Sequence, residues 1–260
     1  MHDQFDLVID AGNSRTKIGW VKEGRFIRSE TTESLDRDML DQWLRKRPAA
    51  IVIGTVGRPI AGLLQEIALE VPVLQVSGNT PLPIRNDYTT PGTLGADRIA
   101  NAVGAWKIFP QRPVLAIDAG TCITYDLVDH DAFLGGAISP GKRLRARAMH
   151  EHSAALPLVD AGVPPAGPIG RSTQGALTSG VHFGLVSEIS GMIERFRHQR
   201  SDMAVILTGG DGLEMARALK SGIFAHPLLT LEGLYAILVH VREAHGLHRS
   251  GWSDGAGAAG

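Results

Sequence analysis

The sequence predicts an α/β fold built from two duplicated halves. Strand-like runs alternate with helical patterns along the chain, which is typical of α/β proteins. A motif also recurs: "LVIDAGNSRTKIGWV" contains Asp10, and "LAIDAGTCITYDLV" contains Asp118 more than a hundred residues later. Each copy reads as a strand, an Asp-Ala-Gly turn, polar residues and a second strand. Because the flanking strands recur together with the turn, we infer a repeated domain rather than a chance match of four letters.

The composition indicates a soluble globular protein. Of the 260 residues, 43% are hydrophobic and 20% charged, and the net charge is -1. Neither nucleic acid nor a membrane is therefore an expected partner, and no apolar run approaches the roughly 20 residues of a membrane helix. The acidic start lacks the pattern of a signal peptide, and the single Cys122 excludes an internal disulfide. We expect a cytoplasmic location.

The first half is expected to form a domain over residues 1–112. Its opening runs "FDLVID", "TKIGWV" and "RFIRSE" read as three strands, the last two joined by a turn at "KEG". The spacing of apolar residues in "SLDRDMLDQWLRKR" predicts a helix with Ser34 as its N-cap. A strand ("AAIVIGTVG"), a helix ("RPIAGLLQEIALE"), a strand ("VPVLQV") and a helix ("GADRIANAVGAWKIF") follow.

The second half, expected over residues 113–247, restarts with the strands "VLAIDAG", "CITYDLV" and "AFLGGAI". A Pro- and Gly-rich stretch leads to a long helical pattern, "STQGALTSGVHFGLVSEISGMIERFRHQR". The strand "MAVILTGG" and the helices "DGLEMARALKSG" and "LEGLYAILVHVREAHG" complete this domain. The Gly- and Ala-rich tail, residues 248–260, has little to bury and is expected to be disordered.

The two acid-tipped hairpins have the chemistry of a nucleotide site. A glycine lets backbone N–H groups approach a phosphate, because no Cβ stands in the way. Asp10 and Asp118 would repel phosphate directly but become useful when cations lie between carboxylate and phosphate. Two such hairpins facing each other across a cleft would hold a nucleoside triphosphate and its metal. Hydroxyl and amide groups that can donate to phosphate oxygens follow each glycine: Asn13, Ser14, Thr16, Thr121 and Thr124.

A competing phosphate motif is set aside. "GGAISPGKR" contains Gly136, four residues, Gly141 and Lys142 as in a P-loop, but Arg143 replaces the Ser or Thr that would hold Mg²⁺. Pro140 also removes one backbone donor of the expected cradle. This stretch is interpreted as a loop that follows a hairpin.

The segment "NDYTTPGTLGADRIANAVGAW" carries the clearest signal for a second substrate. Asp97 and Arg98 fall in the first turn of the predicted helix. A helix N-terminus favours the ionised form of Asp97 and disfavours a cation there. Arg98 therefore has two open interpretations: it binds a carboxylate or phosphate of a substrate, or it is a surface arginine paired with a nearby acid.

The pattern of Asn86, Tyr88, Pro91, Leu94, Gly95, Asp97 and Arg98 resembles the N-x-Y-x-x-P-x-x-L-G-x-D-R motif of type III pantothenate kinases. "DAGNSRTK", "DAGT", "FLGGAISPG" and "IGRSTQGALTSG" match the same family in the same order, over nearly the whole chain. The resemblance implies the actin, sugar-kinase and heat-shock chaperone ATPase superfamily, in which two duplicated ribonuclease-H-like domains clasp ATP. The implied reaction is ATP-dependent phosphorylation of the pantothenate hydroxyl to 4′-phosphopantothenate, the first step of coenzyme A biosynthesis.

The resemblance also implies residue roles. Asp97 is similar to the base that accepts the hydroxyl proton, and Asp118 to the acid that binds a monovalent cation, K⁺ or NH₄⁺; Mg²⁺ accompanies ATP. The implied ATP contacts are Asp10, Ala11, Gly12, Asn13, Ser14, Arg15, Thr16, Lys17 and Thr121. The implied pantothenate contacts are Tyr88, Gly95, Ala96, Asp97, Arg98 and Thr173.

Two further expectations accompany the resemblance. The glycines of the long helix, Gly180 and Gly184 among them, suggest close helix packing, and the resemblance implies a homodimer formed by this half; packing within one subunit is the alternative. The alternatives for the activity are a kinase of the same superfamily with another hydroxylated acceptor, or a regulator that binds ATP without transferring phosphate. Cys122 is expected to pack rather than react.

Overall fold

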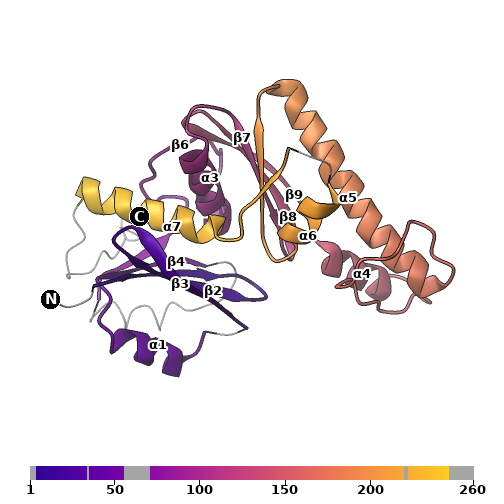
Figure 1. Ribbon diagram of the computed structural model, residues 1–260, viewed down its shortest axis with the longest axis horizontal. Helices are drawn as coiled ribbons and strands as arrows, with labels where there is room; N and C mark the ends of the chain where they lie inside the picture. Colours follow the sequence, from indigo (N-terminus) through magenta and orange to yellow (C-terminus); the bar gives the residue numbers. More distant parts are fainter. Residues whose placement is uncertain (1–3, 34, 56–70, 220–221, 246–260) are drawn as a thin grey trace, which may run out of the picture. The chain divides into compact units, whose positions relative to one another are not determined.

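The computed structural model describes residues 4–33, 35–55, 71–219 and 222–245, and these form two compact units (Figure 1). The first unit combines the chain up to Lys107 with the part from Leu229 onward, and the second covers Ile108–Leu228. Among the described residues, no helix combines the length and apolar character needed to cross a membrane. The predicted helix "RPIAGLLQEIALE", Ser34 and the predicted disordered tail lie outside the described residues.

The first unit contains one mixed β-sheet with the strand order β3-β2-β1-β4-β5. Strands β1, β2 and β3 are antiparallel neighbours, whereas β4 and β5 run parallel to β1. The elements of this unit are β1 (Asp6–Ala11), β2 (Thr16–Lys22), β3 (Arg25–Thr32), α1 (Arg37–Leu44), β4 (Ala50–Thr55), β5 (Val73–Val76), β6 (Arg85–Asn86), the 3₁₀ turn η1 (Pro91–Thr93), α3 (Ala96–Ile108) and α7 (Leu229–His245).

Helices cover both faces of this sheet, with α1 on one face and α7 on the other (Figure 1). Leu40 and Trp43 of α1 join the core formed by alternate residues of the strands, such as Leu7 and Ile9. The N-cap of α1 is Asp36, which accepts a hydrogen bond from the Met39 N–H at 2.8 Å. The sequence pattern predicts Ser34 as the cap, two residues before the observed one.

The second unit repeats this topology. Its sheet contains the order β11-β10-β7-β8-β9, with β7, β8 and β9 antiparallel and with β10 and β11 parallel to β7. This is the arrangement of β5-β4-β1-β2-β3, so the predicted duplication and α/β fold class are confirmed. The elements are β7 (Val114–Ala119), β8 (Cys122–Asp129), β9 (Ala132–Pro140), α4 (Lys142–Glu151), α5 (Thr173–Gln199), β10 (Ala204–Thr208), α6 (Gly212–Ala218) and β11 (Phe224–Ala225).

Helix α7 belongs to the first unit, although the sequence placed residues 113–247 in one domain. Gly233 packs so closely on α3 that a Cβ there would lie 1.8 Å from the carbonyl oxygen of Ala100. The guanidinium of Arg242 donates two hydrogen bonds to the carboxylate of Asp6, at 2.9 and 2.6 Å. Helical periodicity identifies the apolar face of such a helix but not which sheet it covers, so this assignment required the structure.

Candidate active site

Asp10 lies at the end of β1, where the first hairpin turns. The Gly12 N–H donates to the Arg15 carbonyl at 3.1 Å and closes the turn. The side chains of Asn13, Ser14 and Arg15 between the strands are exposed. The turn therefore presents several polar groups beside a single carboxylate, as the sequence predicted.

The segment that carries Asp97 lies beside Asp10 in the same unit. Asp10 is the register partner of Gly54 on β4, and residues paired in this way share one face of a sheet. A Cβ atom placed on Gly54 would lie 3.4 Å from the Cβ of Ala96, in the first turn of α3. The sheet end that holds Asp10 and the helix start that holds Asp97 are therefore neighbours.

Gly95 provides room for the carboxylate of Asp97. A Cβ atom on Gly95 would lie 2.5 Å from Oδ1 of Asp97, closer than van der Waals contact allows. The same Oδ1 accepts a hydrogen bond from the Arg98 backbone N–H at 2.8 Å. Glycine at this position thus lets the carboxylate fold back over the start of α3, where the helix N-terminus favours negative charge.

Arg98 is 5% exposed, so its interpretation as a surface arginine is wrong. Its guanidinium lies 5.4 Å from the ring centroid of Tyr88, and its Nη1 donates to the Tyr88 hydroxyl at 3.4 Å. A buried guanidinium stacked on an aromatic ring is held in a defined orientation. The structure therefore brings together five of the residues implied for pantothenate: Tyr88, Gly95, Ala96, Asp97 and Arg98.

The second hairpin has a shorter turn than the first and is packed more tightly. The Gly120 N–H donates to the Cys122 carbonyl at 3.0 Å, which leaves Gly120 and exposed Thr121 at the tip. Gly209, with a φ of +91°, packs so closely that a Cβ there would lie 2.3 Å from Oδ1 of Asp118. Asp118 therefore lies against glycine backbone contributed by the end of β10.

Two hydroxyl residues share the sheet face of Asp118. Its register partners are Thr124 on β8 and Thr208 on β10. The Thr124 hydroxyl donates to Asp126 at 3.0 Å, whereas the Thr208 hydroxyl is buried with no hydrogen-bond partner among the described residues. Buried hydroxyl groups normally have a partner, so a ligand oxygen or cation beside Asp118 would suit Thr208.

Thr173, the remaining implied contact, is the first residue of α5. Ser172 caps this helix and accepts a hydrogen bond from the Gly175 N–H at 3.1 Å. The exposed Thr173 hydroxyl thus lies at a helix N-terminus, which favours an anionic group. Its role, like the other residue roles, stays a prediction.

Residues that the sequence did not indicate hold the second hairpin in place. Gly141 donates its N–H to the Thr121 carbonyl at 3.0 Å, and Asp211 donates its N–H to the Ala119 carbonyl at 2.9 Å. The Lys142 ammonium lies 2.5 Å from Glu214 Oε2. These contacts join residues far apart in the chain and leave no local sequence pattern. The engaged lysine also agrees with setting the P-loop interpretation aside.

The described residues contain no group of three or more His, Cys, Asp or Glu side chains that could hold a metal ion. Asp10 and Asp118 each supply one carboxylate at a hairpin. Mg²⁺ in nucleotide sites is bound through one or two carboxylates plus phosphate oxygens. The donor set at Asp10 therefore fits an ion that arrives with its nucleotide.

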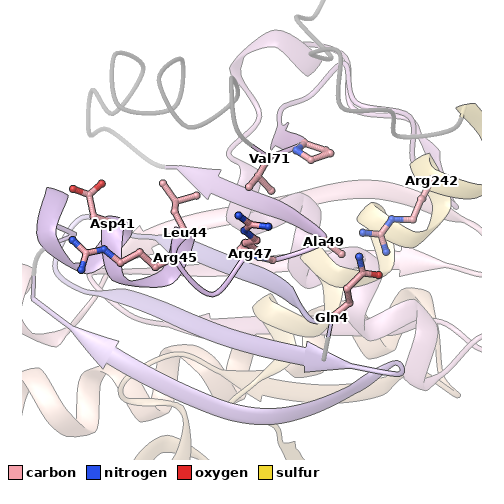
Figure 2. Close-up of a pocket in the computed structure, with 10 residues that line it drawn as sticks. Gln4, Asp41, Leu44, Arg45, Arg47, Ala49, Val71 and Arg242 are labelled. Atoms are coloured by element: carbon pink, nitrogen blue, oxygen red, sulfur yellow. The ribbon is translucent and has the colours of Figure 1, made fainter. Parts of the chain in front are cut away.

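A cavity of about 1120 Å³ in the first unit lies away from these residues (Figure 2). Arg45, Arg47 and Arg242 point toward it, and none of the implied site residues lines it. Its lining includes the residues just before β1, β4 and β5, whereas Asp10 lies at the other end of β1. Arg242 is already engaged by Asp6, and we place the chemistry at the hairpin ends of the sheet.

Comparison with solved structures defines the class of the fold. A conserved protein from Campylobacter jejuni, described as a Baf family transcriptional activator, aligns over 91% of this chain and 99% of its own, with a TM-score of 0.61 and 22% identity. A ROK family glucokinase from Streptomyces griseus, in complex with glucose and AMPPNP, aligns over 88% and 97%, with a TM-score of 0.52 and 14% identity. The chain shares its fold with these two proteins.

Sequence comparison narrows this class to one family. The family model for type III pantothenate kinase matches residues 6–195. A type III pantothenate kinase from Bacteroides fragilis is 40% identical over 238 residues, 90% of this chain and 97% of its own. One from Christiangramia forsetii is 38% identical over 242 residues, 90% and 98% of the two chains. The chain belongs to the type III pantothenate kinase family.

Proposed function

We propose that this protein transfers the γ-phosphoryl group of ATP to the hydroxyl of pantothenate, forming 4′-phosphopantothenate in the first step of coenzyme A biosynthesis. The observation that carries the proposal is the placement of Asp97 beside Asp10 within one unit, in a chain of this family. A metal-organising acid and a candidate base at one site are what transfer from ATP to an alcohol needs.

The acceptor side of the proposed site is formed by residues 95–98 and Tyr88. The buried guanidinium of Arg98 supplies positive charge for the carboxylate of pantothenate and is oriented by the Tyr88 ring. Asp97 accepts the hydroxyl proton as the hydroxyl oxygen forms its bond to the γ-phosphorus and the bond to the ADP oxygen breaks. Thr173 at the start of α5 is proposed as a further contact for pantothenate.

Each unit contributes one hairpin to the proposed contacts with ATP. The residues proposed to surround the phosphates in the first hairpin are Asp10, Ala11, Gly12, Asn13, Ser14, Arg15, Thr16 and Lys17. Asp10 would hold Mg²⁺, which neutralises charge on the phosphates when bound. In the second hairpin the Thr121 hydroxyl contacts ATP, and Asp118 would hold a monovalent cation, K⁺ or NH₄⁺. The buried hydroxyl of Thr208, on the same sheet face, has no hydrogen-bond partner within the described part of the chain, which supports a cation there.

We further propose that the protein is cytoplasmic and forms a homodimer through its second unit. Gly180, Gly184 and Gly191 of α5 have open space where a Cβ would lie, which supports an intermolecular contact over one within the subunit. Sedimentation at micromolar concentration tests the dimer, and a monomer there contradicts it.

A coupled assay of ADP release tests the activity. With ATP and Mg²⁺, we expect turnover that requires pantothenate and rises when K⁺ or NH₄⁺ replaces Na⁺. A panel of sugars and other hydroxylated acids serves as the control for the acceptor. Faster turnover of another acceptor would contradict the substrate, and ATP binding without transfer to any acceptor would indicate a regulator instead.

A further inference from the structure

We propose that Lys142 is a positioning residue for ATP. Through the carboxylates of Asp211 and Glu214 it holds the second hairpin in place without touching the nucleotide. The proposal rests on the proposed function for the roles of Asp118 and Thr121. It is based on contacts within the second unit, where two turns, β9–α4 and β10–α6, each hydrogen-bond to the backbone of the hairpin. Together these two contacts are called the grip on the hairpin.

The first side of the grip is the turn between β9 and α4. The Gly141 N–H donates to the Thr121 carbonyl at 3.0 Å. A Cβ atom on Gly141 would lie only 2.2 Å from the carbonyl oxygen of Gly120, so this turn and the hairpin tip are in direct backbone contact. Lys142 follows at once as the first residue of α4.

The second side is the turn between β10 and α6. The Asp211 N–H donates to the Ala119 carbonyl at 2.9 Å. A Cβ atom on Gly209 would lie 2.5 Å from the same carbonyl oxygen. Because β9 and β10 both run parallel to β7, the two turns and the hairpin meet at one edge of the sheet.

Lys142 joins these two turns. Its Nζ lies 2.5 Å from Oε2 of Glu214, in the first turn of α6, and 3.2 Å from Oδ1 of Asp211. The side chain of Lys142 is 2% exposed. A lysine at a helix N-terminus is unfavourable for the helix dipole, so these two carboxylates offset that cost. The Lys142 ammonium therefore connects α4 to α6, and the side chain points into the protein rather than into solvent.

Removal of this ammonium would leave two carboxylates close together. The side chains of Asp211 and Glu214 are 15% and 26% exposed, and both carboxylates would lose their ammonium partner in this largely buried place. His182 Nδ1 would still lie 3.5 Å from Oε1 of Glu214. Mutual repulsion and hydration of Asp211 and Glu214 would draw the start of α6 away from α4. The backbone contacts from Asp211 to Ala119 and from Gly141 to Thr121 would then lengthen, and Asp118 and Thr121 would lose their fixed positions.

The test is the Lys142→Met variant, which keeps the length of the side chain and removes its charge. We expect KM for ATP to rise, and ATP affinity measured by calorimetry without pantothenate to fall, by about tenfold or more, because small displacements of positioning groups are costly. KM for pantothenate should stay within about threefold, because Tyr88 and residues 95–98 belong to the other unit and Thr173, at the start of α5, is not part of the two turns that contact the hairpin.

Arg147→Met is the matched control. Arg147 also lies on α4, but its exposed side chain pairs with Glu151 of the same helix, at 4.0 Å. This variant also loses a cationic side chain from α4 and an ion pair, but it leaves the contacts of the Gly141 and Asp211 turns with the hairpin in place. We expect its ATP affinity to stay within about twofold of the parent. Equal losses of ATP affinity in the two variants would overturn the proposal in favour of general destabilisation of α4.

Two further variants separate positioning from folding. Lys142→Met combined with Glu214→Gln removes the repulsion and should recover part of the ATP affinity, and Lys142→Arg should recover more. If Lys142→Met does not fold, Lys142→Arg and Glu214→Gln are compared with the parent, and unchanged ATP affinity in both overturns the proposal. A parent protein that fails to bind ATP contradicts the proposed function, whereas normal binding by folded Lys142→Met contradicts only the role of Lys142.

Discussion

The first and second hairpins share their strands and differ in their turns. Strands β1 ("DLVIDA") and β7 ("VLAIDA") have the same length and burial pattern, with Asp10 and Asp118 at the same position. The first turn exposes Asn13, Ser14 and Arg15, whereas the second leaves only Gly120 and Thr121 at its tip. One strand framework thus supports an open polar loop in one unit and a short turn held by neighbouring loops in the other.

The units also differ in the helix that follows the last parallel strand. In the first unit α3 begins with Ala96 and Asp97, whereas α7, which follows the second sheet in sequence, begins with Leu229 and Thr230. The Thr230 hydroxyl donates to Asn101 at 2.8 Å within the core of the first unit. Duplication therefore supplied two hairpins, but the candidate base exists only once.

The largest effect is expected where the units differ most. Asp97→Asn should lower kcat by about 100-fold or more, because the amide cannot accept the hydroxyl proton. The fold and ATP affinity should be retained, since the amide is isosteric and its oxygen can still accept the Arg98 N–H. Steady-state kinetics and calorimetry measure both. Asp87→Asn, an exposed acid paired with Arg85, is the control. A kcat within about threefold of the parent would refute the assignment of the base.

The second prediction tests whether the two hairpin acids have different roles. Asp118→Ala should raise KM for ATP about tenfold and blunt activation by K⁺, while Mg²⁺ dependence is kept. Initial rates over a K⁺ series at fixed Mg²⁺ provide the measurement. Asp129→Ala removes an acid of the same sheet that pairs with Arg200, and it should leave the K⁺ response unchanged. An unaltered cation dependence in Asp118→Ala would show that the acids are not specialised in this way.

The sequence was sufficient for features that local residue order encodes. Asp-Ala-Gly between two strands predicts an acid at a tight turn wherever it occurs, so both hairpins and the α/β layout were predictable. The partners of Lys142 were not, because Asp211 and Glu214 lie far along the chain and no periodic pattern links them. The burial of Arg98 against Tyr88 was not predictable either, because the local sequence of a helix start is the same whether solvent or protein covers it.

The third prediction tests the difference in packing between the turns. Gly209→Ala should lower the free energy of unfolding by more than about 2 kcal/mol, because alanine is strained at positive φ and its Cβ would overlap the Ala119 backbone. In the first hairpin a Cβ on Gly12 would lie 3.1 Å from the Arg15 carbonyl oxygen, an overlap that a small shift relieves. Gly12→Ala should therefore cost less than about 1 kcal/mol. Urea unfolding compares them, and equal costs would contradict the difference.

The smallest predicted effect concerns the side chains that pack against the strands of each hairpin. In the first unit Ile18 and Trp20 of β2 face an apolar core, with the Trp20 ring edge-on to Trp43 at 5.7 Å. In the second unit the Tyr125 hydroxyl of β8 donates to Glu188 of α5 at 2.9 Å. Burial opposes ionisation of Glu188, but hydrogen bonds from Ser139, Arg145 and Tyr125 outweigh it and lower its pKa below the ordinary 4.5.

A lowered pKa in the folded state means that ionised Glu188 stabilises the fold above pH 4.5, and this contribution is lost as the pH falls through the folded-state value. Glu188→Gln should therefore be less stable than the parent at pH 7 by about 1 kcal/mol or less, because the site is partly open to solvent. The difference in unfolding free energy between the parent and the variant should decrease below pH 4.5, as measured by urea unfolding at pH values from 7 to 3. Glu194→Gln, which changes an exposed acid on the same helix, is the control. If this difference in unfolding free energy did not change with pH, the stabilisation would come from the hydrogen bonds alone. The polar contacts behind the second hairpin would then be equivalent to the apolar core behind the first.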